Sequence, residues 1–120
     1  MRAVPKWAQQ LVIDACLKFG QEDLPEVVWR RRDGFSSSGL AHWSGDKISI
    51  NAGQDRIDQK VVLLHELAHW IVGPVEHHSS RFWDVAWELF RWAKLPIGYT
   101  KRREGDYRKG ALAAYHRTRR

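Results

Sequence analysis

Two histidines four residues apart constrain this chain more than any other feature of its sequence. His65 and His69 enclose Glu66 in an H-E-x-x-H pattern, and residues 55–72 around them predict one helix, with an acidic first turn and a Gly-Pro stop. Side chains at positions i and i+4 lie on the same face of a helix, so both imidazoles can reach one metal ion while Glu66 flanks it. The pattern predicts a zinc site built on a helix.

The residue types indicate a reaction as well as a metal. Catalytic zinc sites commonly use three protein ligands and keep one position for water. That water is acidified, and a nearby carboxylate can take its proton and later deliver it to a leaving amine. Glu66 is the candidate general base, so hydrolysis is the expected chemistry. A helix with two structural histidines is the competing interpretation, and it leaves Glu66 unexplained.

A third ligand is required, and the residues directly after the motif helix supply the candidates. Glu76, His77 and His78 stand where the chain turns back toward the metal. Ser79 or Ser80 is expected to cap a second amphipathic helix, which would pack on the motif helix. Its apolar stripe consists of Phe82, Val85, Ala86, Leu89, Phe90 and Ala93.

The motif and the segment His78-Ser-Ser-Arg-Phe82-Trp83 together resemble the SprT-like zinc metallopeptidase domain, whose pattern is H-E-L-x-H, a loop, and H-G-x-x-F-W. The resemblance covers residues 24–93. It implies that His65, His69 and His78 bind Zn²⁺ and that the chain is an endopeptidase acting on protein or peptide substrates. Two departures are that Ser79 stands in place of the usual glycine, and that the C-terminal cysteine-rich zinc ribbon of many members is absent.

A rival resemblance is to the gluzincin-type arrangement, in which a glutamate provides the third ligand. Glu76 would then replace His78, and His77 is a further alternative.

Larger SprT-like proteins are often associated with DNA. The absence of the zinc ribbon weakens the expectation that this chain binds DNA.

The order of patterns predicts an α+β fold of the minimal zincin-like kind. A helix over residues 5–19 precedes a strand over 26–30 and a hairpin formed by 40–43 and 47–51. We therefore expect an N-terminal helix, a small antiparallel sheet of about three strands, and the H-E-x-x-H helix packed on the helix that follows. An extended peptide substrate could add to either hairpin strand, and the sequence leaves both open.

The net charge of +6 comes entirely from the end of the chain. Residues 1–100 contain twelve Lys or Arg and twelve Asp or Glu, whereas the last twenty contain eight and two. We expect one metallopeptidase domain over 1–100 and a basic tail over 101–120, with a short helix near 111–115. The candidates for non-specific nucleic-acid contact are Lys101, Arg102, Arg103, Arg108 and Lys109.

The remaining composition bears on location and on a second function. Cys16 is the only cysteine, so no intrachain disulfide can form, and no signal peptide or membrane-length apolar stretch is evident. A cytoplasmic protein without membrane contact is expected. The alternative function is a nucleic-acid- or protein-binding module in which the zinc is structural or the site is inactive.

Overall fold

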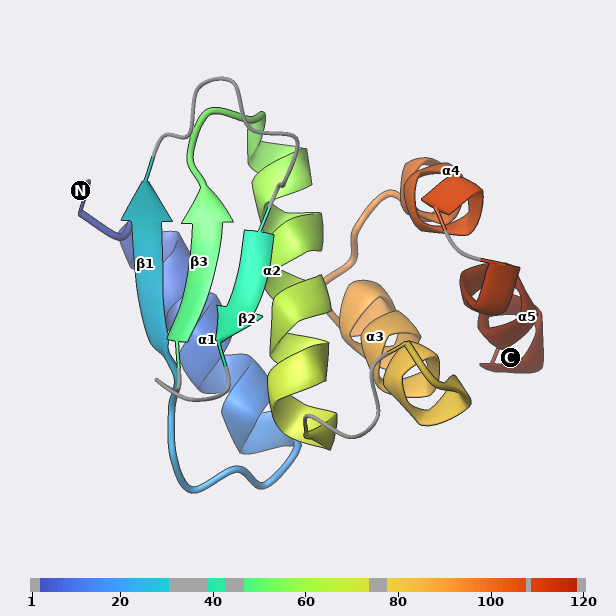
Figure 1. Cartoon of the computed structure of the whole chain (residues 1–120), viewed down its shortest axis with the longest axis horizontal. Coiled ribbons are helices and arrows are strands. Elements are labelled where there is room, and N and C mark those ends of the chain that lie inside the picture. The colour runs from blue at the N-terminus through green and yellow to red at the C-terminus, as the bar shows by residue number, and fades with distance from the viewer. Residues whose placement is uncertain (1–2, 31–38, 43–46, 74–77, 108, 119–120) are drawn as a thin grey trace.

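The structure is a computed structural model that describes residues 3–30, 39–42, 47–73, 78–107 and 109–118. It is a mixed α and β fold in which α2 lies between the sheet and α3 (Figure 1). None of the helices in the described ranges is long and apolar enough to cross a membrane. The elements in chain order are α1 (Lys6–Lys18), β1 (Glu26–Arg30), β2 (Gly39–His42), β3 (Lys47–Asn51), α2 (Arg56–Val72), α3 (Ser80–Trp92), α4 (Ile97–Tyr107) and α5 (Lys109–Thr118).

The three strands form one sheet in the order β1-β3-β2. The hairpin expected from the sequence is present, since β2 pairs antiparallel with β3. The expectation of an all-antiparallel sheet is wrong, because β1 pairs with β3 in parallel. The reason is strand order: β2 occupies the far edge of β3, so β1 and β3, which run the same way, become neighbours (Figure 1). Strand patterns alone do not encode that order.

The central strand, β3, is buried at a polar position as well as at its apolar positions. Ile48 and Ile50 are almost completely buried, as their alternation predicts, but Ser49 between them is only 5% exposed. A middle strand has neighbours on both sides, which removes solvent from its polar positions as well.

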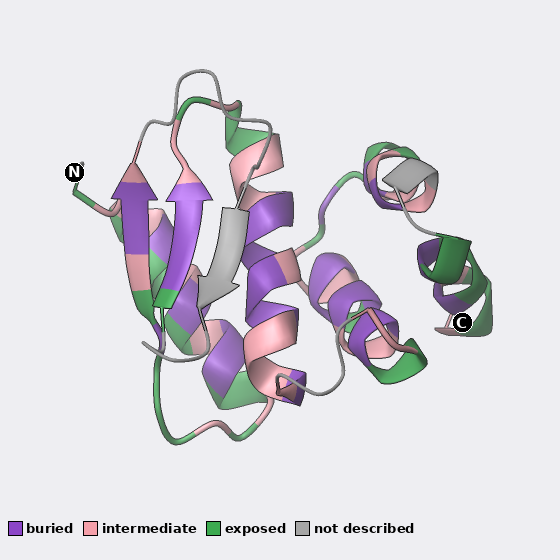
Figure 2. Cartoon of the chain, in the orientation of Figure 1, coloured by how far each residue is buried: buried purple, intermediate pink, exposed green. Residues whose placement is uncertain are grey.

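Helix α2 is the central element of the fold and ends where the sequence predicts. Gly73 has a φ of 94°, a backbone conformation that residues other than glycine rarely adopt. Its N–H donates to the carbonyl of His69. Buried residues run along α2 where it meets the sheet and α3 (Figure 2). Its core residues include Val61, Leu63, Leu64, Leu67 and Ala68.

Helix α3 begins with the expected cap and presents the expected apolar stripe. The Ser79 hydroxyl accepts a hydrogen bond from the backbone N–H of Phe82 at 3.2 Å, which satisfies one of the free donors of the first turn. Four of the six predicted stripe residues are buried, and Val85 and Ala93 pack beside them.

The described residues beyond 100, 101–107 and 109–118, lie in helices α4 and α5, where the sequence suggests a basic tail. A boundary at residue 100 falls inside α4, and the segment 111–115 lies within α5. Ala111 and Ala114 are fully buried, and the indole N–H of Trp87 on α3 donates to the carbonyl of Ala111 at 2.8 Å. The buried face of α5 is made of small alanines, so it carries little of the hydrophobic signal that distinguishes a core helix from a solvated one.

A candidate metal centre on α2 and α3

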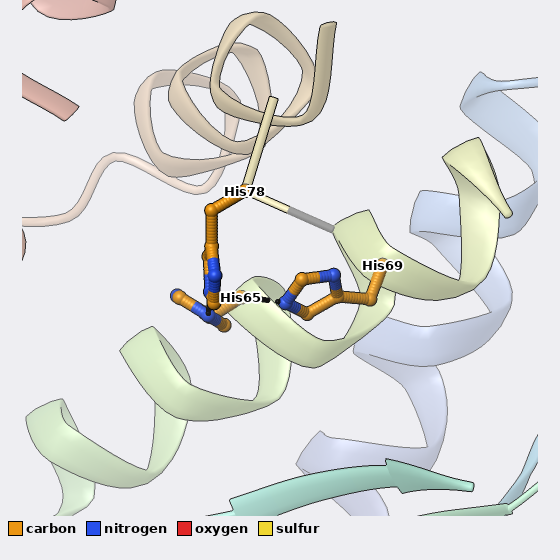
Figure 3. A group of neighbouring side chains, drawn as sticks. All are labelled: His65, His69 and His78. Atoms are coloured by element: carbon orange, nitrogen blue, oxygen red, sulfur yellow. Dashed lines mark hydrogen bonds between the residues drawn. The ribbon is translucent and has the colours of Figure 1, made fainter. Parts of the chain in front are cut away.

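Three histidine rings converge at the junction of α2 and α3. His65 and His69 project from one face of α2, and His78 stands two residues before α3 begins (Figure 3). The Nε2 atom of His78 lies 3.2 Å from Nε2 of His65 and 3.3 Å from Nε2 of His69. The structure therefore brings together the two motif histidines and one of the three candidates for the third position.

The spacing of these nitrogens fits a small divalent cation. Zinc–nitrogen bonds of about 2.0–2.1 Å in a tetrahedral site place two ligand atoms about 3.3 Å apart. The two distances above agree with that edge, and all three candidate ligand atoms lie within 4.8 Å of one another. Three imidazole nitrogens whose lone pairs meet at one point repel one another unless a cation or protons lie between them. The donor set thus fits Zn²⁺, and imidazole ligands also suit other late first-row metals.

Aromatic side chains from the first turn of α3 form the wall behind the histidines. The Phe82 ring stacks on His69 with centroids 4.1 Å apart, and the Trp83 ring lies nearly parallel to that of His78 at 5.7 Å. Both aromatic residues are almost fully buried. They limit ring rotation and exclude water from one side of the site, so the capped start of α3 holds His69 and His78 in place.

Glu66 is placed on α2 between the two motif histidines and is 8% exposed. A carboxylate at this depth loses most of its hydration, so its chemistry is set by the groups of the site rather than by bulk water. Its charge is one of those that raise the pKa of His65, so the carboxylate acts on that ring.

The site also contains a residue that sequence reasoning missed. Glu104 on α4 is buried, and its Oε1 lies 3.0 Å from Nδ1 of His65. Burial lowers the pKa of His65, but the hydrogen bond and charge of Glu104, together with the charge of Glu66, raise it by more, so the pKa lies above its usual 6.5. In the sequence, Glu104 is one of two acidic residues in a basic segment, 39 positions after His65, and nothing local connects it to the motif.

The other predicted residues fall into two groups. Glu76 and His77, the alternatives for the third ligand, lie outside the described residues, and so does Arg108 of the nucleic-acid set. Of the remaining basic candidates, Arg102 and Lys109 are exposed. Arg103 pairs with Asp58 at 3.2 Å, and the Lys101 ammonium lies 4.8 Å from the ring centre of Tyr115. The four described residues of the set have different surroundings, and nucleic-acid contact stays a prediction.

No protein-family model, curated protein or solved structure matches this chain. The resemblance to SprT-like peptidases therefore depends on the motif residues of the sequence and stays a prediction.

Proposed function

We propose that this protein is a zinc-dependent endopeptidase of the SprT-like kind, with His65, His69 and His78 as the metal ligands and Glu66 as the general base. The convergence of the three Nε2 atoms on one point, beside a buried glutamate on the same helix, is the observation that carries the proposal. The H-E-x-x-H spacing in the sequence points to His65, Glu66 and His69 for the same roles.

Each residue has a separate task in peptide hydrolysis. Zinc, when bound, supplies Lewis-acid chemistry that makes a water molecule acidic near neutral pH. Glu66 accepts a proton from the attacking water and donates it to the amine that leaves. Phe82 and Trp83 keep bulk solvent away from the histidines, which strengthens the electrostatic interactions inside the site.

Strand order narrows the choice of substrate edge. β3 pairs with a strand on each side, so it has no edge at which a peptide could add. In the described part of the sheet β2 pairs with β3 alone, and α2 packs against both strands. We infer that an extended substrate adds to β2, where main-chain hydrogen bonds would bind it with little sequence preference.

The competing function, a binding module with a structural zinc, calls for a closed site. Structural zinc is normally held by four protein ligands. Within the described residues the cluster of candidate donors contains the three histidines and no fourth member. A three-histidine set with a glutamate beside it is the composition expected of a catalytic site.

The test is cleavage of an unfolded protein such as casein by the purified, zinc-loaded chain. We expect a chelator to abolish cleavage, and Glu66→Gln to reduce it by about a hundredfold to ten-thousandfold while zinc stays bound, because the amide cannot accept the proton. Glu88→Gln, which alters an exposed glutamate on α3, is the matched control and should cleave normally. Cleavage that survives in Glu66→Gln or in excess chelator would contradict the proposal.

A further inference from the structure

We propose that Glu104 is a positioning residue of the metal centre: its carboxylate fixes the ring of His65 so that Nε2 points to the ion. The inference rests on the metal binding proposed above and adds a fourth residue to it. It also makes helix α4 part of the site, although α4 contributes no ligand.

The geometry assigns the two nitrogens of His65 to different partners. Nδ1 lies 3.0 Å from Oε1 of Glu104, and Nε2 lies 3.2 Å from Nε2 of His78. An ionised carboxylate only accepts hydrogen bonds, so Nδ1 must carry the proton. In the neutral ring Nε2 then keeps its lone pair, which is the form that binds a metal. Glu104 thus selects both the tautomer and the rotation of the ring.

A carboxylate at this position is costly unless it has such a task. Glu104 is 5% exposed, and burial of an unpaired charge is strongly unfavourable. The neighbouring Arg103 extends to α2, where it pairs with Asp58 at 3.2 Å. Its side-chain hydrogen bond in the described structure goes to His65. An apolar residue would fill the same space at lower cost, so the charge is better explained by the histidine than by packing.

Helix α4 is held in the register that brings Glu104 to His65. Tyr99 and Arg103 both bond to the carboxylate of Asp58, which lies seven residues, or two helical turns, before His65 on α2. Three residues of α4 therefore contact one face of α2 at two points. The buried Thr100, whose hydroxyl donates to the carbonyl of Pro96, fixes the start of α4.

The experiment compares zinc affinity across variants by competition with a chromophoric chelator. We expect Glu104→Gln and Glu104→Ala to weaken zinc binding by about tenfold to a hundredfold, the usual effect of removing an outer partner of a ligand histidine. Asp58→Asn removes the other contact between α4 and α2 without touching His65, and Glu88→Gln removes an exposed charge. Glu88→Gln should bind zinc within about twofold of the wild-type chain, whereas Asp58→Asn, which loosens α4 but leaves the carboxylate of Glu104 in place, should lose less affinity than Glu104→Gln.

A second readout needs no zinc and no activity. Long-range ¹⁵N–¹H spectra of the zinc-free wild-type chain, recorded where the ring is neutral, should show His65 protonated at Nδ1, and Glu104→Gln should lose that preference. A proton on Nε2 in the wild-type chain would overturn the inference. So would wild-type zinc affinity in Glu104→Gln, or an equal loss of affinity in Asp58→Asn, which would show that docking of α4 alone matters.

These results separate the inference from the proposed function. If zinc binds and Glu104→Gln weakens it, but casein is not cleaved, the peptidase proposal fails and the role of Glu104 stands. If casein is cleaved while Glu104→Gln keeps its affinity and its His65 tautomer, the role of Glu104 fails and the peptidase proposal stands.

Discussion

The C-terminal helices meet the rest of the molecule at two main joints, α5 on α3 and α4 on α2, and these joints differ in how much apolar surface they bury. Where α5 packs on α3, buried Ala111 and Ala114 lie against the core, and Trp87 donates a hydrogen bond into α5. Where α4 reaches α2, the contacts are polar: Tyr99 and Arg103 bond to Asp58, and Glu104 bonds to His65. The first joint buries apolar surface and also contains hydrogen bonds from Arg91 to Tyr115 and Thr118, whereas the described side-chain contacts of the second are polar.

The difference separates what stabilises the fold from what arranges the site. Apolar burial contributes in proportion to area and tolerates small shifts, whereas a hydrogen bond to a ring nitrogen requires a fixed distance and angle. The α5–α3 joint can therefore hold the helix pair in place while the polar joint sets its register on α2. Changes in the first joint should appear in the free energy of unfolding, and changes in the second should appear mainly in the properties of the groups it aligns, His65 and Tyr99.

The largest effect is expected from Trp87→Ala, which removes a fully buried ring and its hydrogen bond at the apolar joint. Substitutions of this kind cost about 3–5 kcal/mol in the free energy of unfolding, because a cavity remains. Urea unfolding followed by circular dichroism measures the change. Trp87→Phe keeps most of the apolar contact and should lose less. A change below about 1 kcal/mol for Trp87→Ala would mean that α5 contributes little to the fold.

Removal of zinc should have an intermediate effect on the stability of the folded state. A ligand present at a hundred times its dissociation constant stabilises the folded state by about 2.7 kcal/mol, so chelation should lower the thermal midpoint of a zinc-loaded sample. Differential scanning calorimetry with and without zinc measures this shift. His78→Ala is the control, because it removes one of the three ligand rings. An equal zinc-dependent shift in that variant would place the ion elsewhere.

The smallest effect is expected from Asp58→Asn at the polar joint. Arg103 and Asp58 are both partly exposed, and pairs of this kind contribute about 0.2–1 kcal/mol. The more sensitive measurement is the pKa of Tyr99, which the hydrogen bond to Asp58, then burial, and then the charge of Asp58 raise above the usual 10.0. Asp58→Asn should lower it, as measured by ultraviolet titration against Tyr99→Phe.

The sign of this pH dependence follows from the raised pKa. The folded state holds the phenolic proton of Tyr99 more tightly than the unfolded state, so the contact with Asp58 stabilises the protein below about pH 10. That contribution is lost as the pH rises from the ordinary value through the raised one. In Asp58→Asn the alkaline loss should be smaller. An unchanged Tyr99 titration would show that the phenol does not bond to Asp58 in solution.

Local patterns in the sequence predict the first half of this architecture well. The spacing of His65 and His69, the glycine after Val72 and the serine cap at Ser79 each act within a few residues, and the structure shows each where the sequence places it. The sequence offers His78 as one of three candidates for the third metal ligand, and the structure brings it to the motif histidines. The strand at 26–30 and the hairpin also match the strand bounds closely.

The features that were not predicted depend on contacts between distant parts of the chain. The parallel pairing of β1 with β3 is set by which edge β2 occupies, and no pattern within a strand reports that. The partnership of Glu104 with His65 spans 39 residues and joins a charged segment to an apolar one. Because that segment is strongly charged, its sequence predicts a solvent-exposed tail. The buried face of α5 is formed by alanines, which are too small to give a clear hydrophobic periodicity.

The cover that α5 places over α3 has a practical consequence for shortened forms of the chain. A fragment stopped at residue 100 would keep the H-E-x-x-H motif and all three histidines, yet it would uncover apolar surface around Trp87 that Ala111 and Ala114 now shield. A contiguous patch of that kind promotes self-association in solution. Such a fragment would therefore be expected to aggregate on expression and to bind zinc poorly, although its sequence looks like a complete peptidase.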